Sequence, residues 1–341
     1  MSSAARLVAL NESEPFAAAV ASAAGITMLP IEEQRFEGGE FSLRPLESVR
    51  GRQLFVLQSL AGTCDTPTAE RLLRLLFLLN GLRDAGAINR VALLPYLAFA
   101  RQERRTQPRD AVNTRYVAQL LEASGAAGVI ALDVHDSAAL DNSFRIPVDH
   151  LSALPMMVDH FATRFAQAKL CVASPDLGGI KRAQIFRELL AMRLGAEVTL
   201  AFIEKRRVHA TLSVGALIGD TADRVVILID DLCATGSTLS RAVVACRHAG
   251  ASAVHVAVTH TPLPAGLEVL MQAEGLSGVT TTDSAGIHRQ PSPTSPELQK
   301  LTVLSVAPLF GQAVGRLLTG QPLAPLLTQW PVPAAAIRPA Q

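Results

Sequence analysis

The sequence predicts an α/β protein built from two domains, each a mainly parallel sheet flanked by helices. Short apolar runs alternate with amphipathic segments along the chain, and strands separated by single helices form parallel sheets from βαβ units. The alternation restarts after Pro147, and 341 residues are long for one domain. Hydrophobic residues make up 49% of the chain and charged residues 18%, so the chain can form packed cores and is not disordered.

The elements of the N-terminal half follow from local patterns. Apolar runs bounded by turn residues predict strands, and Thr66 with Pro67 at the first helical position opens an amphipathic helix. In chain order we expect a strand at 54–59, a helix from Thr66 onward, a strand at 91–99, a polar loop at 101–111, a helix at 112–124 and a strand at 128–134.

The second half repeats this order. We expect a helix at 154–166, a strand at 169–174, a helix at 179–194, strands at 197–203 and 224–230, a helix at 237–249 and a strand at 253–260. The strand–loop–helix at 54–72 echoes the one at 225–243, which leaves an internal duplication possible. The predicted domains are therefore 1–150 and 151–320, followed by a Pro- and Ala-rich tail at 321–341.

Charge and cysteine content narrow the classes of function. Lys and Arg number 31 against 30 Asp and Glu, a net charge of +1 without the basic excess of a nucleic-acid-binding protein. The four Cys form no CxxC pair and are expected to be free thiols. The chain shows neither a signal peptide nor an apolar stretch of roughly 20 residues that could span a membrane. We therefore expect a cytoplasmic protein that contacts neither membrane nor nucleic acid.

The most informative segment runs from Val225 to Thr238. An apolar strand delivers two adjacent carboxylates, Asp230 and Asp231, to its carboxyl end. The small, hydroxyl-rich turn that follows enters a helix, whose N-terminal N–H groups can cradle a phosphate. The turn consists of Ala234, Thr235, Gly236, Ser237 and Thr238. A plain N-capped helix after a buried strand is the alternative, but two carboxylates there are costly unless they meet a ligand or metal.

This segment resembles the phosphoribosyl-pyrophosphate loop of the phosphoribosyltransferase-type fold. Other segments resemble motifs of the ribose-phosphate diphosphokinases, in that family's order, and the similarity covers residues 6 to 318. They are Arg35-Phe-Glu-Gly-Gly-Glu40, Pro95-Tyr-Leu-Ala-Phe-Ala-Arg-Gln-Glu-Arg-Arg105, Asp133-Val-His135, Ser174-Pro-Asp-Leu-Gly-Gly179 and Glu204-Lys-Arg-Arg207.

The resemblance implies the reaction and its substrates, ATP and ribose 5-phosphate. The anomeric hydroxyl of ribose 5-phosphate would attack the β-phosphorus of ATP, the diphosphoryl group would move, and AMP would leave. Catalysis would then be positioning and charge neutralisation, with Mg²⁺ as the cofactor. The family pattern also implies a homo-oligomer, a dimer or hexamer, in which a neighbouring subunit can complete the adenine pocket.

The resemblance also implies a role for each matching residue. Lys205 and Arg207 would stabilise charge on the transferring phosphoryl groups, and Lys205 is one of only four lysines. The turn 234–238 would hold the 5-phosphate, and Asp230 and Asp231 the ribose hydroxyls. The expected ATP-binding residues are Phe36, Glu40, Arg101, Gln102 and His135, with loop 101–111 as a flexible lid, and the expected metal ligands are His135 and Asp176.

Two departures from the family pattern leave other functions open. Residue 38 is Gly and residue 234 is Ala, where an Asp is usual in the family or in its phosphate-activated class. One alternative is a catalytically weak regulatory homologue that binds active partners. A second is a phosphoribosyltransferase that consumes the pyrophosphate donor, although such enzymes usually need one domain. No Walker A loop and no GxGxxG occurs, so the expectation of ATP use depends on the family motifs.

Overall fold

A computed structural model describes residues 5–204, 207–208, 211–212, 216–286 and 298–327. The chain forms two compact units by its internal contacts. The first runs to Leu151 and also contains the segments around Asp283–Ala285 and Ser305–Leu327. The second runs from Ser152 to Thr282 and also contains the strand Leu301–Leu304. No helix among the described residues is long and apolar enough to cross a membrane.

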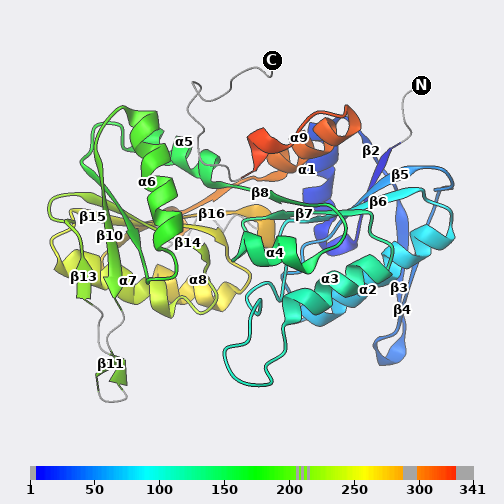
Figure 1. The fold of residues 1–341 in the computed structure, drawn as a ribbon, viewed down its shortest axis with the longest axis horizontal. Coiled ribbons are helices and arrows are strands. Elements are labelled where there is room, and N and C mark those ends of the chain that lie inside the picture. Colours follow the sequence, from blue (N-terminus) through cyan, green and yellow to red (C-terminus); the bar gives the residue numbers. More distant parts are fainter. Residues whose placement is uncertain (1–4, 205–206, 209–210, 213–215, 287–297, 328–341) are drawn as a thin grey trace. The chain divides into compact units, whose positions relative to one another are not determined.

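The first unit contains a six-stranded, fully parallel sheet in the order β2-β1-β5-β6-β7-β8. Its strands are β1 (Arg6–Ala9), β2 (Thr27–Met28), β5 (Gln53–Leu57), β6 (Asn89–Leu94), β7 (Gly128–Leu132) and β8 (Val148–Leu151). Its helices are α1 (Glu14–Ala24), α2 (Thr68–Asp84), α3 (Asn113–Ala123), α4 (Ser137–Ser143) and α9 (Ala307–Leu318), with short 3₁₀ turns η1 (Asn11–Ser13), η2 (Glu37–Gly39), η3 (Asp283–Ala285) and η5 (Ala324–Leu326). Helices α1 and α9 cover one face of the sheet, and α2 and α3 cover the other (Figure 1).

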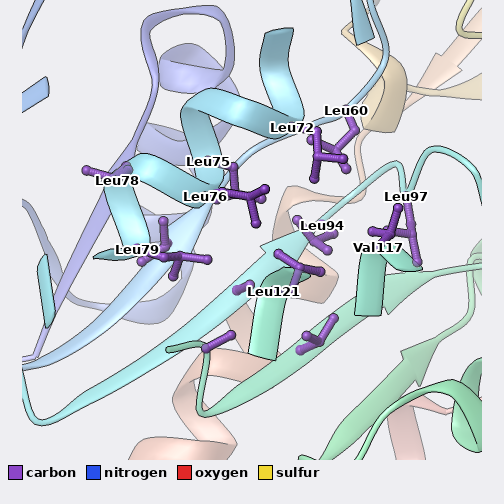
Figure 2. Close-up of a cluster of buried hydrophobic side chains, with 14 of the residues drawn as sticks. Leu60, Leu72, Leu75, Leu76, Leu78, Leu79, Leu94, Leu97, Val117 and Leu121 are labelled. Atoms are coloured by element: carbon purple, nitrogen blue, oxygen red, sulfur yellow. The ribbon is translucent and has the colours of Figure 1, made fainter. Parts of the chain in front are cut away.

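Leucines of α2 form the centre of the core beneath that second face. Leu75 and Leu79 are fully buried and lie with Leu94 of β6 and with Leu121 of α3 (Figure 2). Burying each such side chain contributes about 1.5–3 kcal/mol. A separate antiparallel hairpin, β3 (Ile31–Arg35) and β4 (Phe41–Pro45), packs on the same core through its half-buried apolar residues.

The second unit contains a seven-stranded sheet in the order β13-β10-β9-β14-β15-β16-β17, parallel except for β13. Its strands are β9 (Leu170–Ser174), β10 (Val198–Glu204), β13 (Ala216–Ile218), β14 (Val225–Leu232), β15 (Ala253–His260), β16 (Leu276–Thr282) and β17 (Leu301–Leu304), beside a small pair β11 (Arg207–Val208) and β12 (Thr211–Leu212). Its helices are α5 (Leu154–Arg164), α6 (Ile180–Leu194), α7 (Ser237–His248) and α8 (Pro264–Met271), with the turn η4 (Leu298–Lys300). Helices α5 and α6 lie on one face, and α7 and α8 on the other (Figure 1).

The predicted architecture of mainly parallel sheets flanked by helices is confirmed, with shifts at some element ends. The helix predicted from Thr66 begins at Thr68, with Pro67 as its N-cap residue. The strand predicted at 91–99 ends at Leu94, because the chain bends at residues 95–96; a turn follows, in which Phe99 has a positive φ of 64°. Strand β14 continues to Leu232, so both predicted carboxylates lie within the strand, among its last three residues.

Candidate active site

The order in which strands are added to the second sheet reverses at β9. From β9 the next strand, β10, is added on one side, whereas β14 pairs with β9 on the other. Ligands of open α/β sheets bind outside the carboxyl ends of strands at such a switch point. The segments that leave these ends are the loop 175–179 after β9 and the turn 233–236 after β14, both of which the sequence analysis had selected.

The carboxylates of β14 share one cation, which comes from helix α6. Arg182 Nη1 lies 3.5 Å from Asp230 Oδ1 and 3.3 Å from Asp231 Oδ1. The Asp230 side chain is 22% exposed and the Asp231 side chain 8%, so both carboxyl groups are largely removed from water. The sequence analysis missed Arg182, although it stands in the first turn of the helix predicted at 179–194.

The environment of Asp230 favours its protonated form in the ligand-free chain. Burial, together with the negative charge of Asp231, raises the pKa of Asp230 well above its usual value, and Arg182 opposes the rise. The backbone N–H of Asp231 donates to Asp230 Oδ1 at 2.9 Å, which also favours the charged form. A ligand that brings positive charge or hydroxyl donors to this pair would therefore be bound favourably.

The turn after β14 has the backbone of an anion cradle. Gly236 is the N-cap residue of α7 and adopts φ 74°, a left-handed conformation that favours glycine. Since glycine has no side chain to cap the helix, the first N–H groups of α7 are open to an anion. Thr235 and Ser237 are exposed, and their hydroxyl oxygens lie 3.0 Å apart. Ala234 and Thr238 are half-buried at the two ends of the turn.

The backbone of helix α8 packs directly against the backbone of this turn. A Cβ added to Gly266 would lie 1.9 Å from the carbonyl oxygen of Ala234, and one added to Gly236 would lie 2.2 Å from the carbonyl oxygen of Gly266. Ser240 Oγ donates to the Gly236 carbonyl at 2.9 Å. The position of the turn therefore depends on two glycines that face each other.

Asp176 organises the loop after β9. Its Oδ1 accepts the N–H groups of Gly178 at 3.0 Å and Gly179 at 3.3 Å. Ser174 Oγ donates to the Asp176 carbonyl at 2.6 Å, and a Cβ on Gly179 would meet that hydroxyl at 2.6 Å. One carboxylate oxygen of Asp176 thus holds the loop, and its predicted role as a metal ligand stays a prediction.

The side chains of the two residues predicted to be catalytic lie outside the described part of the structure. Lys205 lies outside the described residues. Arg207 begins the short strand β11, but its side chain lies outside the described part as well.

In the first unit, the residues predicted to bind adenine stand at the tip of the β3–β4 hairpin. The Phe36 N–H donates to the Glu40 carbonyl at 2.8 Å, which closes the tip. Phe36 is 45% exposed and Glu40 is exposed. Gly38 and Gly39 have φ values of 80° and 86°, so the tip requires glycine-like backbone at residue 38.

The Arg-rich loop after β6 is held together by one carboxylate. Asp110 accepts from the N–H of Gln107 at 2.7 Å and from the Thr106 hydroxyl at 2.8 Å, and these hydrogen bonds lower the pKa of Asp110. Arg101 and Gln102 are exposed at the start of the loop, and the Gln102 side chain accepts a hydrogen bond from Asn113. The loop therefore presents cationic side chains to solvent.

His135 is exposed and follows β7 by three residues. The N–H of the preceding Val134 donates to His150 Nε2 of β8 at 2.8 Å, which fixes the backbone before His135. His135 belongs to the first unit and Asp176 to the second. No group of three or more His, Cys, Asp or Glu side chains in the described ranges is placed to hold a metal. An ion such as Mg²⁺, which keeps several waters and binds substrate phosphates, fits such sparse carboxylates.

Comparison with known proteins gives consistent matches over most of the chain. Residues 5–125 match the family model described as the N-terminal domain of ribose phosphate pyrophosphokinase, and residues 156–291 match the phosphoribosyl transferase domain. The ribose-phosphate pyrophosphokinase of Hyphomonas neptunium is 34% identical over 92% of this chain and 96% of its own length. That of Granulibacter bethesdensis is 35% identical, with the same two coverages. The crystal structure of phosphoribosylpyrophosphate synthetase from Mycobacterium smegmatis matches with a TM-score of 0.80 at 30% identity, covering 93% of this chain and 99% of that one.

Proposed function

Since this chain belongs to the ribose-phosphate pyrophosphokinase family, we propose that it transfers the diphosphoryl group of ATP to the anomeric hydroxyl of ribose 5-phosphate. The products are 5-phosphoribosyl 1-pyrophosphate and AMP. The family predicted from the motifs is thereby confirmed, as are the phosphoribosyltransferase-type fold and the assignment as a transferase enzyme. The two-domain division at residue 150 remains part of the proposal.

One observation supports the proposal more than any other. A carboxylate pair, Asp230 and Asp231, lies directly before an anion cradle at the switch point of the second sheet. A sugar phosphate needs both groups, because its phosphate is an anion and its hydroxyls are donors that suit carboxylate acceptors. We assign the 5-phosphate to Ala234, Thr235, Gly236, Ser237 and Thr238, and the ribose hydroxyls to the two Asp.

The nucleotide would be held by residues of the first unit. The exposed Phe36 ring offers a stacking surface for adenine, and Glu40 at the same tip offers hydrogen-bond acceptors. Arg101 and Gln102 would contact the triphosphate, and closure of loop 101–111 would exclude water and limit ATP hydrolysis. We further propose that a neighbouring copy completes the adenine pocket in a homo-oligomer, a dimer or hexamer, and that the enzyme is cytoplasmic.

Magnesium is part of the proposal as the partner of ATP. His135 and Asp176 would hold it, and when bound it would neutralise charge on the phosphoryl oxygens. Lys205 and Arg207 would stabilise the negative charge that develops on the transferring group.

Replacing Lys205 tests the proposed chemistry. Lys205→Ala is expected to lower turnover by about 10²-fold or more, with little change in ribose 5-phosphate affinity, because its contact would strengthen in the transition state. Steady-state release of AMP and calorimetric binding of ribose 5-phosphate measure the two effects. Lys169→Ala, at an exposed lysine before β9, is the matched control. Turnover unchanged in Lys205→Ala would remove that residue from the mechanism.

A further inference from the structure

The β3–β4 hairpin is attached to α2 through three charged residues, the buried Arg74 and Glu33 and the half-buried Glu12, which we call the Arg74 cluster. Arg74 of α2 forms ion pairs with Glu33 of β3 and with Glu12 of η1. The Arg74 and Glu33 side chains are each 4% exposed, and that of Glu12 is 18% exposed. Glu33 Oε1 also accepts the backbone N–H of Asn11 at 2.6 Å. The cluster thus joins three separate segments of the first unit.

The hairpin depends on such side-chain contacts for its position. It forms a two-stranded sheet of its own and does not extend the six-stranded sheet. Alternate residues of β3 share one face, so Glu33 stands between Ile31, which packs on the core, and Arg35, which pairs with Glu70 of α2. A carboxylate at a core-facing position is costly unless it is paired, and Arg74 supplies that partner.

The contacts continue to the tip of the hairpin. The Arg74 guanidinium lies 5.9 Å from the ring centroid of Phe41, which itself lies 5.3 Å from that of Phe77 on α2. In the hairpin register Arg35 pairs with Phe41. The next residues along the two strands, Phe36 and Glu40, are joined by the hydrogen bond that closes the tip. The anchored residues therefore lie next to the proposed adenine-binding residues.

Apolar residues of the same volume could hold the hairpin with equal or greater stability, since buried ion pairs add little net stability. What a charged cluster adds is directional geometry, because a guanidinium meets carboxylates in a limited set of orientations. We propose that Arg74 is a positioning residue for nucleotide recognition, which orients the hairpin so that Phe36 and Glu40 meet the base of ATP. This inference rests on the proposed function, and Arg74 itself touches no substrate.

The test compares two sets of variants of the full chain. The triple variant Glu12→Gln, Glu33→Leu, Arg74→Met removes the buried charges together, which avoids leaving a lone buried carboxylate that could prevent folding. The matched control is Arg44→Gln, because Arg44 pairs with Glu32 on the opposite, solvent-exposed face of the same hairpin. The measurements are KM for ATP, KM for ribose 5-phosphate, and hydrogen exchange of the amides in residues 31–46.

The triple variant is expected to raise KM for ATP about tenfold or more, since a misplacement of about 1 Å can cost up to 10²-fold. KM for ribose 5-phosphate should stay within twofold, and the hairpin amides, including that of Phe36, should exchange faster. Arg44→Gln should match the unchanged protein in all three measurements. A KM for ATP within twofold of the original, or equal rises in both KM values, would overturn the inference. If the unchanged protein releases no AMP from ATP, the proposed function is wrong. Hydrogen exchange in the triple variant then tests the anchoring role by itself. Faster exchange of the hairpin amides supports that role, and unchanged exchange overturns it.

Discussion

At the scale of single residues, Arg182 sets the charge of the proposed ribose site. One guanidinium pairs with two carboxylates, Asp230 and Asp231, and it opposes the rise in the pKa of Asp230 that burial and the charge of Asp231 cause. Ionised carboxylates accept hydrogen bonds from ribose hydroxyls, whereas protonated ones lose part of that capacity. If Asp230 binds the ribose as proposed, Arg182 is expected to influence that binding through the pKa of Asp230.

Removal of this guanidinium should make ribose 5-phosphate binding depend more steeply on pH. Without Arg182 the pKa of Asp230 rises further, so fewer molecules carry an ionised Asp230 at neutral pH, and this charge returns as pH increases. Arg182→Gln is expected to weaken binding about tenfold at pH 7 and less at pH 9, as measured by calorimetry across this range. Arg193→Gln, near the end of the same helix and paired with Asp159, should bind as the original does. A loss in Arg182→Gln that is the same at every pH would contradict this account.

The sequence predicted Asp230 and Asp231 at a strand end but gave no signal for Arg182. The carboxylates follow an apolar strand in an uninterrupted local pattern, which makes them visible without a structure. Arg182 contacts them from α6, 48 positions before Asp230 in the chain, and this contact depends on how β9 and β14 pair. Local periodicity carries no information about that pairing.

At the scale of elements, the turn 234–238 and helix α8 are in close backbone contact. Gly266 brings its helix so close to Ala234 that no side chain fits between them. The sequence analysis selected the turn itself and did not predict α8. The β3–β4 hairpin was missed also, because β3 reads Ile-Glu-Glu-Gln-Arg, with a single apolar residue to indicate a strand.

A methyl group at residue 266 should therefore displace the turn. Gly266→Ala places a Cβ 1.9 Å from the Ala234 carbonyl oxygen, so the turn or α8 must move. Ribose 5-phosphate affinity is expected to fall at least about tenfold, with ATP affinity unchanged, in calorimetric titrations. Gly315→Ala in α9 is the control, since a Cβ there meets nothing within 4 Å. Equal ribose 5-phosphate affinity in Gly266→Ala and the control would show that the turn does not depend on this contact.

At the scale of the whole chain, the two units differ at the corresponding switch points of their sheets. In the first unit the switch point lies between β1 and β5, whose following segments are joined by hydrogen bonds. Ser13 Oγ donates to Gln58 Oε1 at 3.0 Å, and Ser59 Oγ donates to the Ser284 carbonyl of η3 at 2.8 Å. All four of these residues are at most 5% exposed. Hydrogen bonds within the chain therefore occupy the place that corresponds, in the second unit, to the proposed ribose 5-phosphate site.

One ribose 5-phosphate should therefore bind per chain, despite the similarity between the segments 54–72 and 225–243. Calorimetric titration with ribose 5-phosphate is expected to give a stoichiometry of one, and Asp231→Asn should weaken that single site. A second equivalent that survives in Asp231→Asn would mean that the first unit also binds the sugar phosphate.

The sequence did not indicate which of the two units the C-terminal helix α9 packs in. Helix α9 packs on α1 in the first unit, with Phe310 and Phe16 at a ring-centroid distance of 6.0 Å and Gly311 close against Ala23. The sequence-based division placed α9 in the second domain, because the residues that precede this helix in the chain belong to that domain. An apolar helical face indicates that a helix is buried, but it does not indicate against which core.

Phosphorus NMR of the purified protein with ATP, ribose 5-phosphate and Mg²⁺ tests the central claim most directly. The account predicts that AMP and a new pyrophosphorylated sugar grow in equal amounts, because one diphosphoryl transfer yields both. ADP or free phosphate in their place would contradict diphosphoryl transfer. No reaction, with ribose 5-phosphate binding intact, would contradict catalysis and favour a regulatory homologue.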